Sequence, residues 1–122
     1  MNDAESFKNK PLLRRVLFAM EGIADSIKTS QSFKTQLFLG GAGLVLFAVL
    51  KASAFWWGAY ILASSAVLSL ELLNTALEHL LDALYPSIHP LIKRAKDCAA
   101  GAVLVASLSA ILILLIFLIA QL

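Results

Sequence analysis

Three long runs without a charged residue constrain this chain more than any other feature. They cover residues 35–50, 52–70 and 98–122 of a chain of 122 residues. A helix that crosses a bilayer needs roughly 20 predominantly apolar residues. Backbone amides within a bilayer must be paired inside the segment, so we expect each run to form a transmembrane helix.

The composition supports a membrane protein. Hydrophobic residues make up 60% of the chain and charged residues 15%, whereas a soluble domain has about 45–50% and about 25%. The mean hydropathy is +0.84. A net charge of +2 is too small to favour a nucleic-acid partner, and the single cysteine, Cys98, excludes an intrachain disulfide framework. The sequence therefore predicts one all-α membrane domain over residues 1–122.

The segment before the first apolar run has the pattern of an amphipathic helix. Apolar residues recur there at helical spacing, and charged residues fill the other side. The apolar positions are Leu12, Leu13, Val16, Leu17, Met20, Ile23, Ala24 and Ile27. We predict a helix on the membrane surface over about residues 1–30, and the alternative is a soluble helix packed on another subunit. Transmembrane helices are predicted at about 34–51, 54–84 and 91–120.

Positive charge predicts the orientation. Six Lys or Arg residues precede the first span and three lie between the second and third, whereas only Lys51 lies on the other side. This bias predicts that the N-terminus and the second loop are cytoplasmic. We expect Trp56, Trp57 and Tyr60 to mark the outer interface. The glycines of the first span are expected to allow close helix packing; they are Gly40, Gly41 and Gly43.

The second span carries polar residues that do not suit a lipid-facing helix. Glu71, Asn74, Glu78 and Asp82 lie at offsets of 0, 3, 7 and 11, which fall within roughly 80° around a helix. A carboxylate at membrane depth costs on the order of 2.5–3.5 kcal/mol. This stripe favours a divalent-metal and proton-transfer site. The alternative is a solvated stripe beyond the end of the bilayer.

A second polar cluster begins the third span, with Lys93, Arg94, Lys96 and Asp97. Basic residues can simply anchor a helix at the interface. Asp97 beside Lys96, across a short loop from the acidic stripe, could instead hold a nucleotide and its metal. Carboxylates with a nearby lysine suit phosphoryl transfer, although the sequence has no Walker A or kinase-type glycine loop. A proton-coupled transport subunit would also use intramembrane carboxylates.

The histidines and the cysteine, which could also ligate a metal, are expected to have structural roles. We predict His79 and His89 to be interfacial histidines with local hydrogen bonds rather than ligands, and Cys98 to be a packing residue.

At these polar residues the sequence resembles the small bacterial membrane lipid kinases, the prokaryotic diacylglycerol kinase and undecaprenol kinase family. The most specific segments are Glu71-Leu-Leu-Asn74-Thr-Ala-Leu-Glu78-His and Ala95-Lys96-Asp97, followed by Ala99-Ala100-Gly101-Ala102. The resemblance implies a homotrimer in the bacterial cytoplasmic membrane, with sites shared between subunits. It also implies Mg2+ and ATP as phosphoryl donor, and transfer to a lipid hydroxyl at the cytoplasmic surface.

The resemblance also implies roles for individual residues. Glu71 corresponds to the general base, Glu78 to a metal ligand, and Asn74 to a residue that orients phosphate or metal. Lys96 and Asp97 would contact the nucleotide, and Asp82 would support that region.

One position departs from the family pattern. The family carries a second metal-binding glutamate between the surface helix and the first span, and here that stretch reads Ser30-Gln31-Ser32-Phe33-Lys34. Ser30 lacks a carboxylate, so we do not predict it to be a ligand. Three explanations stay open: Asp25 or Glu21 substitutes, metal binding is weaker, or the activity is lost or changed.

The motifs look nearer to the undecaprenol kinase branch, because the diacylglycerol kinase branch more often has a serine where this chain has Ala100. We therefore expect an undecaprenol kinase. The alternatives are a diacylglycerol kinase that makes phosphatidic acid, and a catalytically weakened or non-catalytic membrane scaffold.

Overall fold

A computed structural model describes residues 9–122, and all regular structure in this part is helical. The order is α2 (Leu12–Thr29), α3 (Gln31–Val49), α4 (Ala54–Leu84) and α5 (Pro90–Ala120). The helices α3, α4 and α5 are each long and apolar enough to cross a membrane. This confirms the predicted all-α fold with three spans. The part of the expected surface helix at residues 1–8 lies outside the described residues.

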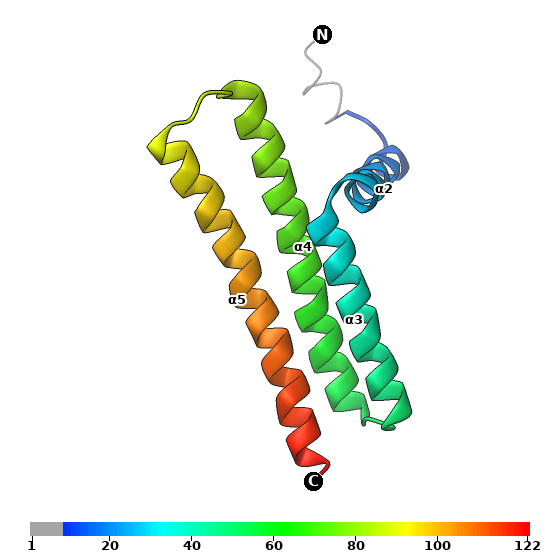
Figure 1. The fold of residues 1–122 in the computed structure, drawn as a ribbon. Coiled ribbons are helices and arrows are strands. Elements are labelled where there is room, and N and C mark those ends of the chain that lie inside the picture. Colours follow the sequence, from blue (N-terminus) through cyan, green and yellow to red (C-terminus); the bar gives the residue numbers. More distant parts are fainter. Residues whose placement is uncertain (1–8) are drawn as a thin grey trace.

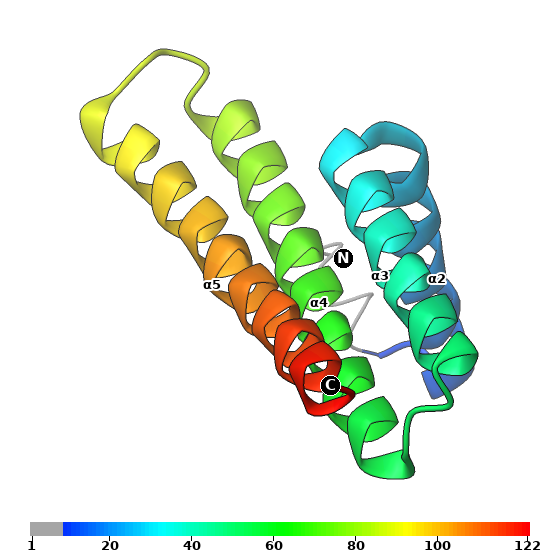
Figure 2. The ribbon, with the colours of Figure 1, turned by 60° about the horizontal axis from the view of Figure 1, so that its bottom comes forward.

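The three long helices run side by side, and α2 lies at a steep angle to them near one end (Figure 1). The most extensive packing is between the antiparallel helices α4 and α5, and α3 packs on α4. Figure 2 shows α4 between α3 and α5, and side chains of α3 and α5 also contact each other. Because α4 is central, residues of α3 and α5 can both reach its polar stripe.

Side-chain caps explain where α3 and α5 begin. The hydroxyl of Ser30 accepts a hydrogen bond from the backbone N–H of Phe33 at 3.1 Å, which caps the first turn of α3. His89 caps α5, because its Nδ1 accepts from the N–H of Leu91 at 3.1 Å. Pro90 then occupies the first helical position, where its missing N–H costs nothing.

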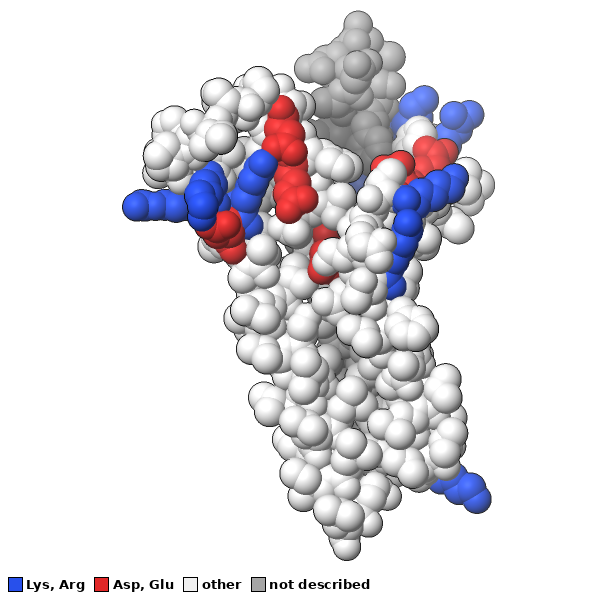
Figure 3. Space-filling view, in the orientation of Figure 1, with Lys and Arg blue, Asp and Glu red and all other residues white. Residues whose placement is uncertain are grey.

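Charged residues gather at one end of the molecule (Figure 3). This end, called the charged end below, contains α2 and the loop between α4 and α5. The loop between α3 and α4, which contains Lys51, lies at the opposite end. The segregation agrees with the charge bias of the sequence.

A cluster of buried aromatic residues lies towards the opposite end. Phe47 and Phe117 are fully buried, with ring centroids 4.6 Å apart, and Tyr60 packs edge-to-face on Phe47 at 4.9 Å. Tyr60, which we expected to mark the outer interface, packs against α3: the residue is 2% exposed, and its hydroxyl donates to the Gly40 carbonyl oxygen at 3.1 Å. Gly43 leaves room for the tyrosine ring beside α3. The ring can be buried there because its hydroxyl has a backbone carbonyl as hydrogen-bond partner.

Of the three glycines in α3, only Gly43 makes the expected close approach. A Cβ atom built on Gly43 would overlap the Tyr60 ring and hydroxyl, whereas one on Gly40 or Gly41 would meet nothing within 4 Å. The interface between α3 and α4 therefore depends on one glycine rather than on all three.

Candidate active site

The polar stripe of α4 is divided between two environments. Glu71 is 2% exposed, whereas Glu78 and Asp82 lie where the helix is largely open to its surroundings. The helix therefore leaves the protein interior between its first and last carboxylates.

Glu71 has a partner that the sequence did not indicate. The hydroxyl of Ser32 donates a hydrogen bond of 2.6 Å to Oε1 of Glu71. Ser32 lies in the first turn of α3, 39 residues away in the chain. Burying a polar group without a hydrogen-bond partner costs free energy, and Ser32 supplies a donor to Glu71. The only available signal was that Ser32 falls within the segment where this chain departs from its family pattern.

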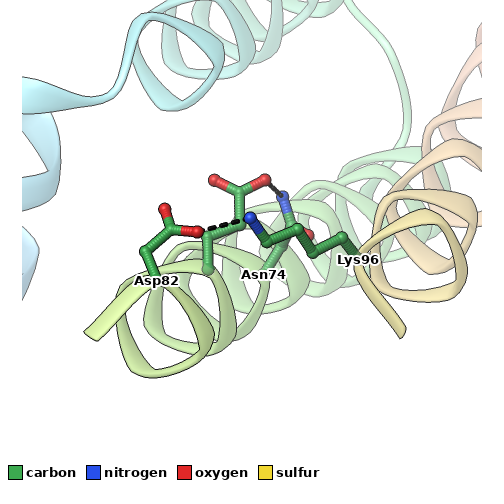
Figure 4. A network of polar contacts seen from close by, with 4 residues as sticks. Asn74, Asp82 and Lys96 are labelled. Carbon is green, nitrogen blue, oxygen red and sulfur yellow. Dashed lines mark hydrogen bonds and ion pairs between the residues drawn. The ribbon is translucent and has the colours of Figure 1, made fainter. Parts of the chain in front are cut away.

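Asn74 and Glu78 form the next part of the site (Figure 4). The Asn74 side-chain amide donates to Oε1 of Glu78 at 3.4 Å, across one helical turn. The amide oxygen of Asn74, Oδ1, is buried and has no hydrogen-bond partner within the described residues. An unpaired buried carbonyl oxygen is unusual and costs free energy. The Asn74 side chain thus offers an oxygen acceptor next to the Glu78 carboxylate.

Lys96 connects α5 to the stripe. Its ammonium forms an ion pair with Asp82, so the two helices are joined at the charged end (Figure 4). Asp97 does not face α4, since it pairs with Lys93 on its own helix at 2.6 Å. Both carboxylates are 63% exposed, and exposed ion pairs contribute only about 0–1 kcal/mol. An incoming polyanion can therefore replace either carboxylate at small cost.

Ser30 has a structural task, because it caps α3. Within residues 9–122, no group of three or more His, Cys, Asp or Glu side chains is close enough to hold a metal ion. Glu21 and Asp25 therefore do not complete such a group with the α4 carboxylates. His79 and His89 are likewise not part of one. A metal that is bound partly by phosphate oxygens needs only one or two protein carboxylates.

The chain matches a sequence profile described as prokaryotic diacylglycerol kinase over residues 17–118. The chain belongs to this family. The match includes α3 and α4 in full and most of α2 and α5. The description of this family indicates a lipid kinase, and kinase chemistry implies ATP as the phosphoryl donor.

The relatives carry two different substrate names. A diacylglycerol kinase of Synechocystis is 39% identical over 103 residues, which cover 84% of this chain and 59% of that protein. An undecaprenol kinase of Bacillus subtilis is 37% identical over 119 residues, which cover 95% of this chain and 97% of that protein. A diacylglycerol kinase of Helicobacter pylori strain J99 is 28% identical over 102 residues, which cover 84% of this chain and 78% of that protein. The chain thus spans less than two thirds of the Synechocystis relative and nearly all of the Bacillus one.

Proposed function

We propose that this protein transfers the γ-phosphoryl group of ATP to the hydroxyl of a membrane lipid, and that the lipid is undecaprenol. The observation that carries the proposal is a buried carboxylate, Glu71, within a few helical turns of exposed carboxylates and of Lys96. Phosphoryl transfer needs a base, oxygen ligands for a metal and a cation near the phosphates. These three kinds of group are available in the same stretch of the fold.

Glu71 is proposed as the general base. Its carboxylate accepts the proton of the lipid hydroxyl as the hydroxyl oxygen forms a bond to the γ-phosphorus. The bond between that phosphorus and the bridging oxygen of ADP breaks, so the products are ADP and a lipid phosphate monoester. The proton on Glu71 then passes to water. A buried position suits a base that must meet an alcohol at the edge of the bilayer.

Asn74 and Glu78 are proposed to hold Mg2+. Carboxylate and amide oxygens are ligands that this ion accepts, and the unpaired Oδ1 of Asn74 lies on the residue that already contacts Glu78. When bound together with ATP, the ion would neutralise charge on the phosphate oxygens. Ser30 has no role in this proposed set.

Lys96 is proposed to bind the nucleotide phosphates, with Asp97 and Asp82 supporting that region. Asp82 pairs with the Lys96 ammonium at the end of the stripe. A triphosphate carries more negative charge than one carboxylate, so it would displace Asp82 from Lys96. Asp97, paired with Lys93, would hold the neighbouring cation in place on α5.

Undecaprenol is proposed over diacylglycerol on two grounds. The motif comparison favours the undecaprenol branch, and the undecaprenol kinase relative matches this chain almost from end to end. The somewhat higher identity to the Synechocystis relative makes diacylglycerol the second candidate.

A homotrimer with shared sites and a cytoplasmic active site are part of the proposal. The described helices leave a groove of about 660 Å3 between α3, α4 and α5, lined mostly by apolar residues, with Gln36, Ser64, Ser65 and Ser107 among the polar ones. The side chains of Gln36 and Ser107 are 3.2 Å apart and form a hydrogen bond. Helices of neighbouring subunits would cover such mixed surfaces in a membrane, where small and polar residues favour helix association. The excess of basic residues at the charged end supports its cytoplasmic location.

The test is a lipid panel. Purified protein in mixed micelles is given labelled ATP, Mg2+ and either undecaprenol or dioleoylglycerol. We expect labelled lipid phosphate, with a higher kcat/KM for undecaprenol, and we expect Glu71→Gln to lower kcat by about 10²–10⁴-fold while ATP still binds. Ser69→Ala is the control on the same helix, because the Ser69 hydroxyl donates to the Ser65 carbonyl of its own helix.

Three results would contradict parts of this proposal. ATP hydrolysis or ion flux without any phosphorylated lipid would exclude the kinase. A preference for dioleoylglycerol would move the protein to the diacylglycerol branch. Near-normal turnover in Glu71→Gln would exclude Glu71 as the base.

A further inference from the structure

The contact between Ser32 and Glu71 joins two helices at the place where the proposed chemistry occurs. Its length of 2.6 Å is that of a strong hydrogen bond between a hydroxyl and a carboxylate. Glu71 is a buried acidic residue, and within residues 9–122 this is the hydrogen bond found for its carboxylate. The orientation of the carboxylate is therefore set by a residue of α3 rather than by α4 alone.

The fold fixes the position of Ser32 firmly. The cap from Ser30 closes the first turn of α3, and Phe33 in the same turn is 2% exposed. Ser32 lies between these two anchored residues, so its backbone has little freedom. Figure 1 shows the start of α3 beside the middle of α4.

We propose that Ser32 is a positioning residue for the general base. This inference rests on the proposed function of Glu71. Ser32 holds Oε1, which leaves Oε2 as the oxygen that accepts the proton of the lipid hydroxyl. Without the Ser32 hydroxyl the carboxylate can rotate about its terminal torsion, which is broad for glutamate. Fewer molecules then present an oxygen to the hydroxyl at the reacting distance.

A purely structural role would give a different pattern of effects. If the hydrogen bond only joined α3 to α4, its loss would lower stability and leave the kcat of the folded enzyme unchanged. If it positions the base, its loss lowers kcat, leaves KM for ATP unchanged, and has no further effect once the side chain at position 71 can no longer accept a proton. The two roles are therefore separable by kinetics.

The experiment compares Ser32→Thr with Ser32→Val in the full-length protein in mixed micelles. The two introduced side chains have nearly the same shape, and only threonine keeps the hydroxyl. We expect Ser32→Thr to stay within about threefold of the parent kcat. We expect Ser32→Val to lose about 10- to 100-fold in kcat, the range of a hydrogen bond to a charged group. KM for ATP should change less than about twofold in both, since Ser32 does not contact the nucleotide in the proposal. Thr35→Val is the control, because the Thr35 hydroxyl donates to the Gln31 carbonyl of its own helix.

The same two changes are then placed in the Glu71→Gln background. We expect the two double variants to have equal kcat within about twofold, since Ser32 acts through the carboxylate. Equal kcat for Ser32→Thr and Ser32→Val in the parent background would overturn the inference. A tenfold or greater difference in kcat between the two double variants would overturn it as well, because Ser32 would then act without the base.

Failure of the inference is distinguishable from failure of the proposed function. If the parent protein phosphorylates lipid and Glu71→Gln does not, the proposed function stands whatever Ser32 does. If the parent protein phosphorylates no lipid in the panel, the proposed function itself is wrong and the inference falls with it. Should Ser32→Val fail to fold, Ser32→Ala in the two Glu71 backgrounds makes the same comparison.

Discussion

The contact between Gly43 and Tyr60 is predicted to control the stability of the α3–α4 interface. A methyl group on residue 43 would overlap the ring and hydroxyl of Tyr60. The Tyr60 hydroxyl would then leave the Gly40 carbonyl, to which it now donates at 3.1 Å. The Gly43→Ala change therefore forces a fully packed ring to move and breaks a buried hydrogen bond.

The loss of stability expected for Gly43→Ala follows from these two effects. Overpacking of a core costs about 1–3 kcal/mol, and a lost intramolecular hydrogen bond costs about 0.5–1.5 kcal/mol. Replacing a glycine within a helix by alanine raises helix stability by about 1 kcal/mol through helix propensity alone. The gain cancels when Gly43→Ala is compared with Gly41→Ala, where the new methyl group meets nothing within 4 Å. We expect Gly43→Ala to be less stable than Gly41→Ala by about 3 kcal/mol.

Reversible unfolding by sodium dodecyl sulfate in mixed micelles, followed by circular dichroism, measures this difference. Gly58→Ala is a second control, since a methyl group there also meets nothing within 4 Å. Tyr60→Phe measures the hydrogen bond alone and should cost about 1 kcal/mol. If Gly43→Ala proves as stable as Gly41→Ala, the close approach of α3 to Tyr60 is not what holds these helices together.

Three further predictions concern the proposed site. Glu78→Ala should raise the Mg2+ concentration needed for half-maximal turnover, while Glu78→Asp should raise it less; an unchanged Mg2+ titration would argue against ligation by Glu78. Ser30→Ala should destabilise the protein by about 1 kcal/mol through loss of the α3 cap. Ser30→Asp should keep the cap and also lower the Mg2+ concentration needed for turnover. Equal unfolding midpoints for the two variants would disprove the capping role. Lys96→Met should raise KM for ATP more than about tenfold, and Asp82→Asn should change it less, because Asp82 only competes with the phosphates for Lys96; a normal KM in Lys96→Met would show that ATP binds elsewhere.

The interfacial aromatic residues illustrate a limit of sequence patterns. Tyr60 follows Trp56 and Trp57 near the start of a span, and that spacing is typical of an aromatic belt. The structure buries Tyr60 because Gly43 on α3 leaves room for its ring and the Gly40 carbonyl pairs its hydroxyl. The pattern describes one helix, but burial depends on the neighbouring helix as well.

The sequence by itself determined the helical class, the three spans and the polar stripe of α4. Hydropathy and helical periodicity are local properties, and in a bilayer they leave the backbone no alternative to a helix. Only the tertiary structure decided that Ser32 bonds to Glu71, that Lys96 rather than Asp97 reaches α4, and that Ser30 caps a helix within the segment that departs from the family pattern. The contacts of Ser32 and Lys96 depend on how far one helix slides along another, and that register is set by side-chain packing between residues far apart in the chain.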